Sequence, residues 1–549
     1  MTYDEARAQL IAWRDDYPDN PFQSDPLLRK LLTRYLDGAR LSDLERRASA
    51  FAAAVTSVVA PAAARYEQRA HLAEFSPYDG IGRRIERVDF DPSYHVAGEA
   101  VWASGVVALS GEPGRAFEQA TLLSLLSLEG EAGHACPATC TIGLARALRR
   151  RADAAVADRF LPALLEADYT LAERGAQFLT EVQGGSDVGA NACVAEPSGD
   201  GVSFLITGEK WFCSVADAHQ FFVTARVPGA AAGTAGLASF VVPRELDGVP
   251  NGFTLRRLKD KLGTRGLASG EIDFVGARAW PIAPLEEGFR TAVSVVLNTS
   301  RWMTAVGAAG IMRRAVLEAR NFARHREAFG RPIERFAAVQ LTLADMAVAA
   351  DGALALVMAL TDVEDRIDAR RATEADVHWH RLLVNLAKYL TSRQATSVAR
   401  DGIEVLGGNG TIEEFSVLPR LYRDAIVYES WEGTHNVLAA QVLNDLRRLP
   451  LLEVASARLR ALVRGDVAGL NDGLTIALEG LERCRDDGEF AAWHLRDVLD
   501  RLGYVAEAIY LADAGSPVAA HHLLARTAPG YDPTGDVGLA ERVEKLLAT

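Results

Sequence analysis

The sequence predicts an α+β protein that is mostly helical, with a small β domain between helical parts. Three observations lead to this prediction. At 549 residues the chain is too long for one compact core, so several domains are expected. Both ends of the chain are rich in helix-forming residues at helical spacing. The segment in between consists of short β-branched and aromatic runs cut by Gly, Pro and Asp.

The first expected domain covers residues 1–178. Between about residues 42 and 174, stretches such as "LSDLERRASAFAAAVTSVVA" and "IGLARALRRRADAAVADRFLPALL" repeat Ala, Leu, Glu and Arg at the spacing of amphipathic helices. The second expected domain, residues 179–288, contains "GVSFLITGEKWFC", "QFFVTARV" and "LASFVVP", which are typical of strands.

From residue 289 the helical pattern returns, in long segments at roughly 299–328, 335–362, 375–406 and 434–447. Four such segments predict an antiparallel four-helix bundle over residues 289–447. Residues 448–549 also have a helical pattern, broken near "GDVAGLNDG" and "APGYDPTGD", which indicates an appended C-terminal helical region.

Charge and cysteine content limit the possible functions. The net charge of −14 argues against a surface that tracks phosphates along a nucleic acid. The five cysteines form no dense framework and show no zinc-ligand spacing, so reduced thiols in a cytosol and no metal site are expected. The N-terminus lacks the pattern of a signal peptide, and the apolar run "MAVAADGALALVMAL" is short of bilayer length. We therefore expect a cytoplasmic protein without membrane segments.

Five polar and glycine-rich clusters are candidates for chemistry: "TEVQGGSD" (180–187), "GEKWFCS" (208–214), "RHREAFGRPI" (324–333), "EVLGGNG" (404–410) and "YESWEGTHN" (428–436). Each also has a purely structural interpretation, because glycine pairs form turns, aromatic residues fill cores and glycines end helices. No Rossmann fingerprint, P-loop, nucleophile elbow or zinc-protease motif is present.

Glu432 in the last cluster has two interpretations. As a structural residue it would compensate the dipole of the helix that follows, with Thr434 as the N-cap and Gly433 in the preceding turn. As a functional residue it would be a carboxylate beside Trp431 in a poorly hydrated site, where burial would raise its basicity. The local pattern leaves both open.

Taken together, the five clusters resemble the acyl-CoA dehydrogenases, in the order and approximate separations of that family. Within the family, the chain is most similar to the branch of the bacterial adaptive-response flavoprotein, through "YDGIGRRIERVDFDPSYH", "EAGHACPATCTIGLARAL", "RLKDKLGTRGLASGEIDF" and "LPRLYRDAIVYESWEGTHNV". The likeness covers roughly residues 25–447. It implies an N-terminal helical domain, a middle β-barrel-like domain and a four-helix bundle, with FAD as cofactor between the last two.

The resemblance implies roles for particular residues. In the β domain, Thr180, Gly185 and Ser186 match residues at the flavin and the thioester, while Phe212 and Ser214 match residues that flank the flavin ring. Residues that match FAD contacts, some of them to a neighbouring subunit, are Arg326, Phe329, Glu404, Gly407, Gly408, Thr434 and Asn436. Ser186 and Arg301 match the substrate side. A homo-oligomer, often a tetramer, is implied.

Glu432 matches the family's catalytic base, which would remove the α-proton of an acyl-CoA thioester to give a trans-2-enoyl-CoA. Relatives that place the base one helix earlier have an acid before the arginine, whereas this chain has Ser300 before Arg301. Ala337 replaces a glutamine that is frequent in the family, and Asn298 stands where many members have an acid near CoA. These departures bear on the identity of the thioester.

The resemblance also raises alternatives. The branch's typifying member binds duplex DNA through a basic C-terminal region, but residues 445–549 here contain 12 Lys and Arg against 17 Asp and Glu, a net charge of −5. DNA binding is therefore not expected. A flavin oxidase or an elimination enzyme is a third possibility within the fold. The physiological electron acceptor implied by the family is an electron-transfer flavoprotein.

Overall fold

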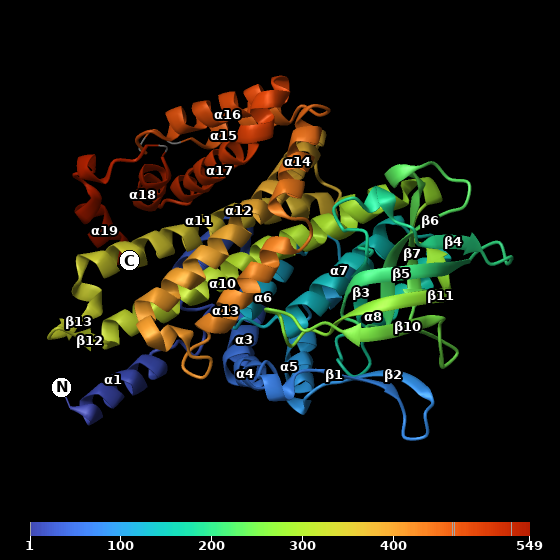
Figure 1. Ribbon diagram of the computed structural model, residues 1–549. Coiled ribbons are helices and arrows are strands. Elements are labelled where there is room, and N and C mark those ends of the chain that lie inside the picture. Colours follow the sequence, from blue (N-terminus) through green and yellow to red (C-terminus); the bar gives the residue numbers. More distant parts are fainter. Residues whose placement is uncertain (1, 464, 466, 529, 549) are drawn as a thin grey trace. The chain divides into compact units, whose positions relative to one another are not determined.

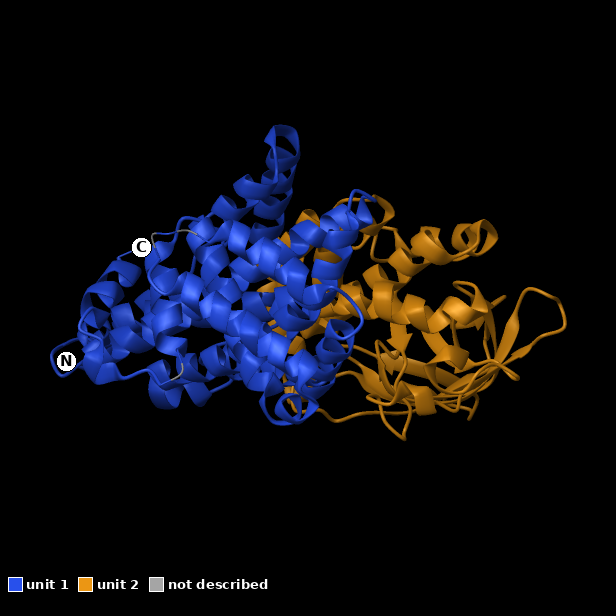
Figure 2. Ribbon diagram, turned by 90° about the horizontal axis from the view of Figure 1, so that it is seen from above, with its two compact units in different colours: residues 1–53, 127–130, 304–549 blue, residues 54–126, 131–303 orange. Residues whose placement is uncertain are grey.

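The computed structural model describes residues 2–463, 465, 467–528 and 530–548 (Figure 1). The chain divides into two compact units, shown in Figure 2. Unit 1 comprises residues 1–53, 127–130 and 304–549, and unit 2 comprises residues 54–126 and 131–303. The expected domain boundaries at residues 178, 288 and 447 stay a prediction.

Unit 2 combines helices with the β domain. Its helices are α4 (Ala60–Tyr66), α5 (Pro92–Ala103), α6 (Ala116–Ser127), α7 (Ala132–Arg151), α8 (Ala154–Leu164) and the short α9 (Gly288–Thr291). The hairpin of β1 (Glu74–Tyr78) and β2 (Arg84–Asp89) interrupts the helices, which the sequence interpretation did not expect. Gly82, in the left-handed region with φ 81°, allows the turn between the two strands.

The β domain is built on a seven-stranded sheet. Its strands are β3 (Gly175–Phe178), β4 (Val194–Pro197), β5 (Phe204–Ser214), β6 (Gln220–Arg226), β7 (Leu237–Pro243), β10 (Phe253–Leu258) and β11 (Ser269–Pro281). The strand order is β10-β11-β5-β4-β6-β3, and β7 pairs with both β11 and β6. The pairing therefore closes on itself, which confirms the expected barrel-like arrangement.

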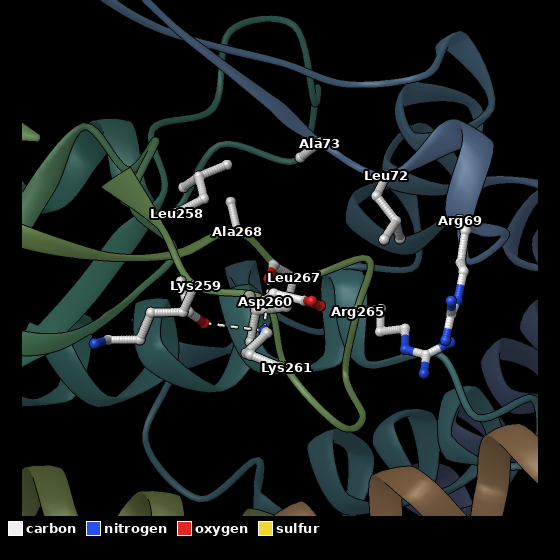
Figure 3. Close-up of a pocket in the computed structure, with 11 residues that line it drawn as sticks. Arg69, Leu72, Ala73, Leu258, Lys259, Asp260, Lys261, Arg265, Leu267 and Ala268 are labelled. Atoms are coloured by element: carbon white, nitrogen blue, oxygen red, sulfur yellow. Dashed lines mark hydrogen bonds between the residues drawn. The ribbon is translucent and has the colours of Figure 1, made fainter. Parts of the chain in front are cut away.

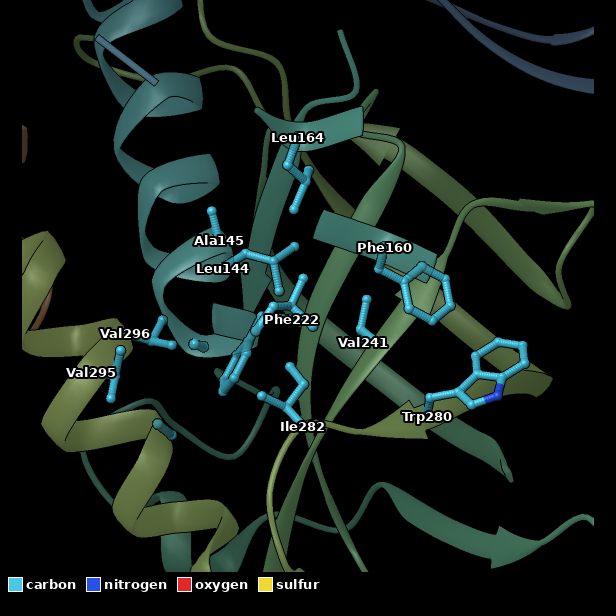
Figure 4. Close-up of a cluster of buried hydrophobic side chains, with 13 residues drawn as sticks. Leu144, Ala145, Phe160, Leu164, Phe222, Val241, Trp280, Ile282, Val295 and Val296 are labelled. Atoms are coloured by element: carbon cyan, nitrogen blue, oxygen red, sulfur yellow. The ribbon is translucent and has the colours of Figure 1, made fainter. Parts of the chain in front are cut away.

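One hydrophobic cluster joins the helices of unit 2 to this sheet (Figure 4). Leu144 and Leu148 of α7 and Phe160 and Leu164 of α8 meet side chains of the sheet, including Phe222 of β6. All five side chains are at most 5% exposed. Burying side chains of this size stabilises a fold by about 1.5–3 kcal/mol each. The α7 helix is thereby fixed against the β domain that carries two of the candidate clusters.

Unit 1 contains the predicted bundle. Its helices are α1 (Tyr3–Asp15), α2 (Pro26–Tyr35), α3 (Gly38–Ala54), α10 (Asn298–His325), α11 (Ala337–Asp368), α12 (Glu374–Leu406), α13 (Leu418–Ser430) and α14 (His435–Leu446), where α3 and α10 begin or end at the border with unit 2. The helices of the bundle follow the expected segments closely. Arg313 of α10 forms an ion pair with Asp351 of α11, with 2.8 Å between Nη1 and Oδ1.

The C-terminal region is helical, as expected, and forms part of the same compact unit as the bundle. It contains α15 (Leu451–Leu462), α16 (Leu470–Asp486), α17 (Gly488–Asp513), α18 (Pro517–Thr527) and α19 (Leu539–Leu547). Tyr389 of α12 donates a hydrogen bond of 2.6 Å to the carboxylate of Asp500 in α17. His522 of α18 lies 2.7 Å from the carboxylate of Asp345 in α11. Polar contacts therefore bind this region to the bundle.

Two helical stretches, Gly38–Tyr66 and Ala337–Asp368, pass a test of length and composition for crossing a membrane. The second contains the apolar run noted in the sequence, within a helix of 32 residues. In its most apolar window 78% of the residues are buried inside the protein, as in the core helix of a soluble protein. For Gly38–Tyr66 the buried share is 39%. The cytoplasmic location stays a prediction.

Candidate active site

The residues predicted to bind cofactor and substrate fall in both units. Unit 2 holds Thr180, Gly185, Ser186, Phe212, Ser214 and Arg301, and unit 1 holds Arg326, Phe329, Glu404, Gly407, Gly408, Glu432, Thr434 and Asn436. Within each unit, these residues lie at the ends of strands or helices, and several adopt backbone conformations that favour glycine.

A buried ion pair anchors the loop of residues 180–187. The Glu181 carboxylate lies 2.7 Å from the Nζ of Lys210 on β5, and both side chains are at most 2% exposed. Glu181 also accepts hydrogen bonds from the backbone N–H groups of Ala192 and Cys193, at 2.6 and 3.2 Å. Burial alone would raise the pKa of Glu181, but the Lys210 ammonium and these donors lower it below its ordinary value. Glu181 is therefore ionised and holds the loop on the sheet.

Thr180 and Gly185 lie against each other in this loop. A Cβ added to Gly185 would be 2.7 Å from the Thr180 Oγ1, closer than real side chains approach. A larger residue at this position would displace the Thr180 side chain, which glycine leaves in place. The backbone of Thr180 is fixed as well, because its carbonyl accepts a 2.9 Å hydrogen bond from the N–H of Trp211. Ser186 is exposed beside them.

The end of β5 presents an aromatic side chain and a hydroxyl. Phe212 is 57% exposed, which is unusual for so large an apolar residue. Lys259 places its Nζ 3.7 Å from the ring centroid of Trp211 and 5.0 Å from that of Phe212. Ser214 pairs with Ser269 across β5 and β11, and their hydroxyl oxygens lie 3.2 Å apart. This strand end is thus ordered, although Phe212 is not covered.

The first turn of α10 contains the polar residues that mark the departures from the family pattern. The Ser300 hydroxyl donates a 3.0 Å hydrogen bond to the side-chain oxygen of Gln177 on β3, so a neutral contact occupies the place of an acid. Arg301 is buried, with 3% exposure. Asn298 is 6% exposed, and its Oδ1 has no hydrogen-bond partner among the described residues. A buried acceptor without a donor is costly, which favours a polar ligand group nearby.

Glu432 occupies the turn between α13 and α14. Helix α13 ends at Ser430, and Trp431, its C-cap, stacks on Tyr428 with the ring centroids 4.9 Å apart. Glu432 follows with φ 55°, a left-handed conformation that costs a residue other than glycine about 1–3 kcal/mol. Such strain concentrates at functional sites. The Glu432 side chain is neither buried nor fully exposed.

A buried lysine holds this turn. Lys388 of α12 is 0% exposed, and its Nζ donates hydrogen bonds of 2.9 Å each to the backbone carbonyls of Glu429 and Gly433. These carbonyls flank Glu432 on both sides. The Glu429 carboxylate also lies 2.9 Å from Nε2 of His435. Burial alone would raise the pKa of Glu429, but its hydrogen bonds from His435 and Thr396 lower that pKa. Both contacts fix the backbone on which Glu432 stands.

Thr434 occupies the N-cap position of α14, as expected, but its side chain makes no capping hydrogen bond. Its hydroxyl is therefore not used in the way the structural interpretation assumed. Thr434 and Asn436 are both exposed at the start of the helix. The N-terminus of a helix carries N–H groups without intrahelical partners and attracts anionic groups. Both side chains are thus placed to contact a polar ligand.

Arg326 and Phe329 lie at the end of α10, in the hairpin of β12 (Glu327–Ala328) and β13 (Arg331–Pro332). Phe329 is 96% exposed and has φ 53°. An exposed phenylalanine in a left-handed conformation is unfavourable on both counts, since it loses hydrophobic burial and strains the backbone. Arg326 is half-buried. The hairpin therefore presents an apolar tip.

The glycines after α12 leave an open backbone. Gly407 has φ 62° and follows directly on the helix, whose last turn contains the exposed Glu404. No atom of the described residues lies within 4 Å of a Cβ added to Gly407 or Gly408. The pair therefore ends the helix and leaves space at the backbone for another molecule to approach.

Each unit by itself offers features that suit a part of FAD, which has aromatic and anionic groups. In unit 2, the exposed Phe212 suits a planar ring. In unit 1, the open backbone at Gly407 and Gly408 admits the close approach of another molecule. The turn around Glu432 supplies a carboxylate that could move a proton on a neighbouring substrate.

Sequence reasoning missed the two lysines that position these segments. Lys210 belongs to the cluster "GEKWFCS", and its burial beside Glu181 could have been suspected from a charged residue within an apolar strand. Lys388 lies within a long helix, 44 residues before Glu432, and nothing in the local pattern distinguishes it from a solvent-exposed lysine.

Comparison with known families gives matches along most of the chain. Residues 15–171 match the adaptive response protein AidB N-terminal domain, residues 176–276 the acyl-CoA dehydrogenase middle domain, and residues 286–446 the acyl-CoA dehydrogenase C-terminal domain. AidB of Escherichia coli (strain K12) is 35% identical over 387 residues, which are 68% of this chain and 69% of AidB. Acyl-CoA dehydrogenase family member 11 of Caenorhabditis elegans is 30% identical over 77% of this chain and 70% of its own length.

Solved structures agree with these matches. A structure described as the Bd2924 apo-form has a TM-score of 0.83 at 27% identity and covers 90% of this chain and 98% of its own. ACDH-11 of Caenorhabditis elegans in complex with C11-CoA has a TM-score of 0.81 at 26% identity, over 95% of this chain and 90% of its own. An acyl-CoA dehydrogenase complexed with FAD from Bacillus anthracis has a TM-score of 0.70 at 17% identity, over 92% of this chain and 88% of its own, which shows a shared fold.

Proposed function

This chain belongs to the acyl-CoA dehydrogenase family, a family of FAD-dependent oxidoreductases, and on that premise we propose that it converts an acyl-CoA thioester to the trans-2-enoyl-CoA with Glu432 as the catalytic base. The observation that carries the proposal is the construction of the turn around Glu432. Glu432 has a strained backbone, and the buried Lys388 binds the carbonyls on both sides of it. This conformation costs free energy, and capping a helix does not require a strained residue. ACDH-11 of Caenorhabditis elegans was solved with C11-CoA, which supports an acyl-CoA as the substrate class.

The proposed reaction needs a base at the α-carbon. The thioester carbonyl makes the α-proton weakly acidic, and the Glu432 carboxylate removes it. Trp431, which directly precedes Glu432, is held in place by its stack on Tyr428. Lys388 keeps the carbonyls of Glu429 and Gly433 from turning away, so the carboxylate keeps its direction. FAD, when bound, supplies the acceptor for the hydride that leaves the β-carbon.

The remaining predicted residues would hold the cofactor and the thioester. Thr180, Ser186 and Ser214 offer hydroxyl groups on the β domain, and Phe212 offers a ring. On the bundle, the backbone at Gly407 and Gly408 and the start of α14 at Thr434 and Asn436 would meet the polar parts of FAD. Arg301 and Ser186 are assigned to the substrate.

A homo-oligomer follows from the same proposal. Phe329, which is 96% exposed with a left-handed backbone, would be covered by a neighbouring subunit, and Arg326 would reach that subunit's FAD. Light scattering of the purified holoenzyme should give the mass of an oligomer, and we expect a tetramer. Phe329→Ser should lower both the mass and the FAD content. An electron-transfer flavoprotein is the proposed electron acceptor.

The base assignment is tested with Glu432→Gln, which keeps the shape of the side chain and removes its basicity. Purified holoenzyme is mixed anaerobically with acyl-CoAs of different chain length, and bleaching of the flavin is followed. General-base catalysis contributes typically 10²–10⁴-fold, so Glu432→Gln should bleach at least roughly a hundredfold more slowly. Glu414→Gln, an exposed glutamate in the same unit, is the matched control and should bleach like the parent. Equal rates for Glu432→Gln and the parent would refute the assignment.

A further inference from the structure

A cavity of about 420 Å³ lies in unit 2, beside the end of β5, where its lining residue Ser269 contacts Ser214 and its lining residue Lys259 lies over the Phe212 ring. It is bounded by the segment around Arg69–Ala73, which follows α4, and by the connection between β10 and β11, residues 258–269 (Figure 3). Four of its lining side chains are cationic, namely Arg69, Lys259, Lys261 and Arg265, and one is anionic, Asp260. Positive charge is thus concentrated here in a protein whose net charge is −14.

The two lysines are engaged within the protein. Lys259 forms an ion pair of 2.6 Å with Glu271 on β11. The Nζ of Lys261 donates hydrogen bonds of 2.6 Å to the Leu267 carbonyl and 3.0 Å to the Ser269 hydroxyl. Both therefore brace the connection between the strands, and Glu271 compensates the charge of Lys259.

Unlike the two lysines, the two arginines of the cavity have no partner within the described part of the protein. Neither Arg69 nor Arg265 makes a hydrogen bond or an ion pair with any other residue in the described part of the chain, although Arg265 is half-buried. Both side chains project toward the same end of the cavity (Figure 3). Two guanidinium groups that project from different bounding segments toward the same space repel each other unless an anion lies between them. Guanidinium groups also match the geometry of phosphate oxygens.

In the described part of the chain, Asp260 is the one carboxylate that lines the cavity. It is exposed and has no ion-pair partner among the described residues, so it can turn toward an arginine when no anion is present. It would then compete with an anionic ligand. This competition gives the site a testable signature, because removing Asp260 and removing an arginine should change anion affinity in opposite directions.

We propose that this cavity binds the phosphate group of a small phosphorylated ligand, with Arg69 and Arg265 as the donors. Its volume falls within the range of small-molecule sites, roughly 300–1,000 Å³, and exceeds what inorganic phosphate needs, so the phosphate can belong to an ester such as a nucleoside monophosphate. The site contains none of the residues assigned to FAD or to the thioester. Phe212 and Ser214 contact two of the lining residues, so the proposal concerns a second ligand beside the dehydrogenase site and not a step of its reaction.

The test is calorimetric titration of the holoenzyme at low salt with two probes, inorganic phosphate and adenosine 5′-monophosphate. Arg69→Gln and Arg265→Gln should each weaken binding roughly tenfold, the usual effect of one charge-assisted hydrogen bond. Asp260→Asn should tighten binding severalfold. Arg83→Gln removes an exposed arginine on the β1–β2 hairpin, outside the cavity, and should leave affinity unchanged.

The outcomes separate the possibilities. Tighter binding of the nucleotide than of phosphate identifies an ester ligand, and equal binding identifies free phosphate. The proposal is overturned if neither probe binds at millimolar concentration, or if Arg83→Gln weakens binding as much as Arg265→Gln does. It is also overturned if Asp260→Asn has no effect. Acyl-CoA bleaching and FAD content should be unchanged in all four variants, so failure of this site and failure of the dehydrogenase assignment give different results.

Discussion

Two buried glutamates, one in each unit, have pKa values shifted in opposite directions because their partners differ. Glu181, in the loop of residues 180–187, is 2% exposed and meets the Lys210 ammonium at 2.7 Å, so its pKa lies below the ordinary value. Glu507 of α17 is 0% exposed and accepts a 2.9 Å hydrogen bond from the Gln394 side chain of α12. Burial raises the pKa of Glu507 to about 8.

The difference follows from the partner. A cation stabilises the charged form of Glu181, so this loop is held by an ion pair throughout the neutral range. An amide leaves most of the cost of burial in place, so Glu507 is protonated at neutral pH. Glu507 also packs on α11, where a Cβ added to Gly352 would be 3.1 Å from its carboxylate. The candidate-site loop thus keeps its ion pair at neutral pH, whereas Glu507 of the C-terminal region is buried with a proton bound.

The largest effect is expected from Lys210→Met, which removes the cation and leaves Glu181 buried. Breaking a buried ion pair on one side typically costs about 3–5 kcal/mol, because the remaining charge has no counter-charge. Urea denaturation should show a lower midpoint, and FAD content should fall with the loop. Lys210→Met combined with Glu181→Gln is the matched control and should recover a large part of the loss. Equal midpoints for the single and the double variant would contradict this account.

The second effect is a pH dependence of the C-terminal attachment. The folded pKa of Glu507 is raised from 4.5 to about 8, so its contribution to stability is fully present below pH 4.5 and is lost as the pH rises through 8. One proton corresponds to about 1.4 kcal/mol per pH unit, and Glu507 is half ionised at pH 8, which gives a loss of about 2 kcal/mol between pH 6 and pH 8. The denaturation midpoint should fall over this range in the parent.

Glu507→Gln keeps the shape of the side chain and removes the titration. Its midpoint should depend less on pH than that of the parent, and above pH 8 it should be the more stable protein. Other carboxyl groups with a raised pKa, such as that of Asp351, remain in both proteins, so only the difference between the two proteins reports on Glu507. Parallel curves for parent and variant would show that the attachment is not coupled to this proton.

A smaller effect is expected from Lys388→Met in α12. The substitution removes the hydrogen bonds to the carbonyls of Glu429 and Gly433, at a cost of about 2 kcal/mol for donors of this kind. Unlike Lys210→Met, it should lower kcat/KM more than it lowers FAD content, because Glu432 loses its direction while the other cofactor contacts remain. An unchanged kcat/KM at full FAD content would show that Lys388 serves stability alone.

The helices of the bundle and the β domain were predicted from the sequence. Helical periodicity predicted the bundle, because α11 and α12 bury long apolar faces, and strand-like runs predicted the β domain. The β1–β2 hairpin was missed because it is short and lies between strong helical patterns. The candidate residues came from clusters with unusual local composition.

The sequence could not give the contacts that join distant segments. Lys388 and Gln394 occupy ordinary positions in a helix, and their importance depends on which residues the fold brings beside them. Contacts between residues distant in the sequence are set by tertiary packing, and local periodicity carries no information about them. For the same reason the sequence does not distinguish Arg69 and Arg265, which line the cavity and have no ion-pair partner among the described residues, from solvated surface charges.

The smallest effect concerns the strain at Glu432, where φ is 55°. If the turn holds this conformation at a cost, Glu432→Gly should relieve the strain, whereas Glu432→Ala should retain it. Both variants lack the carboxylate and should be equally inactive in anaerobic bleaching. We expect the glycine variant to exceed the alanine variant in stability by roughly 0.5–1 kcal/mol, after the larger backbone entropy of glycine in the unfolded chain is subtracted. If alanine is instead the more stable, the turn imposes no strain, and the argument that Glu432 is placed there for catalysis loses its energetic support.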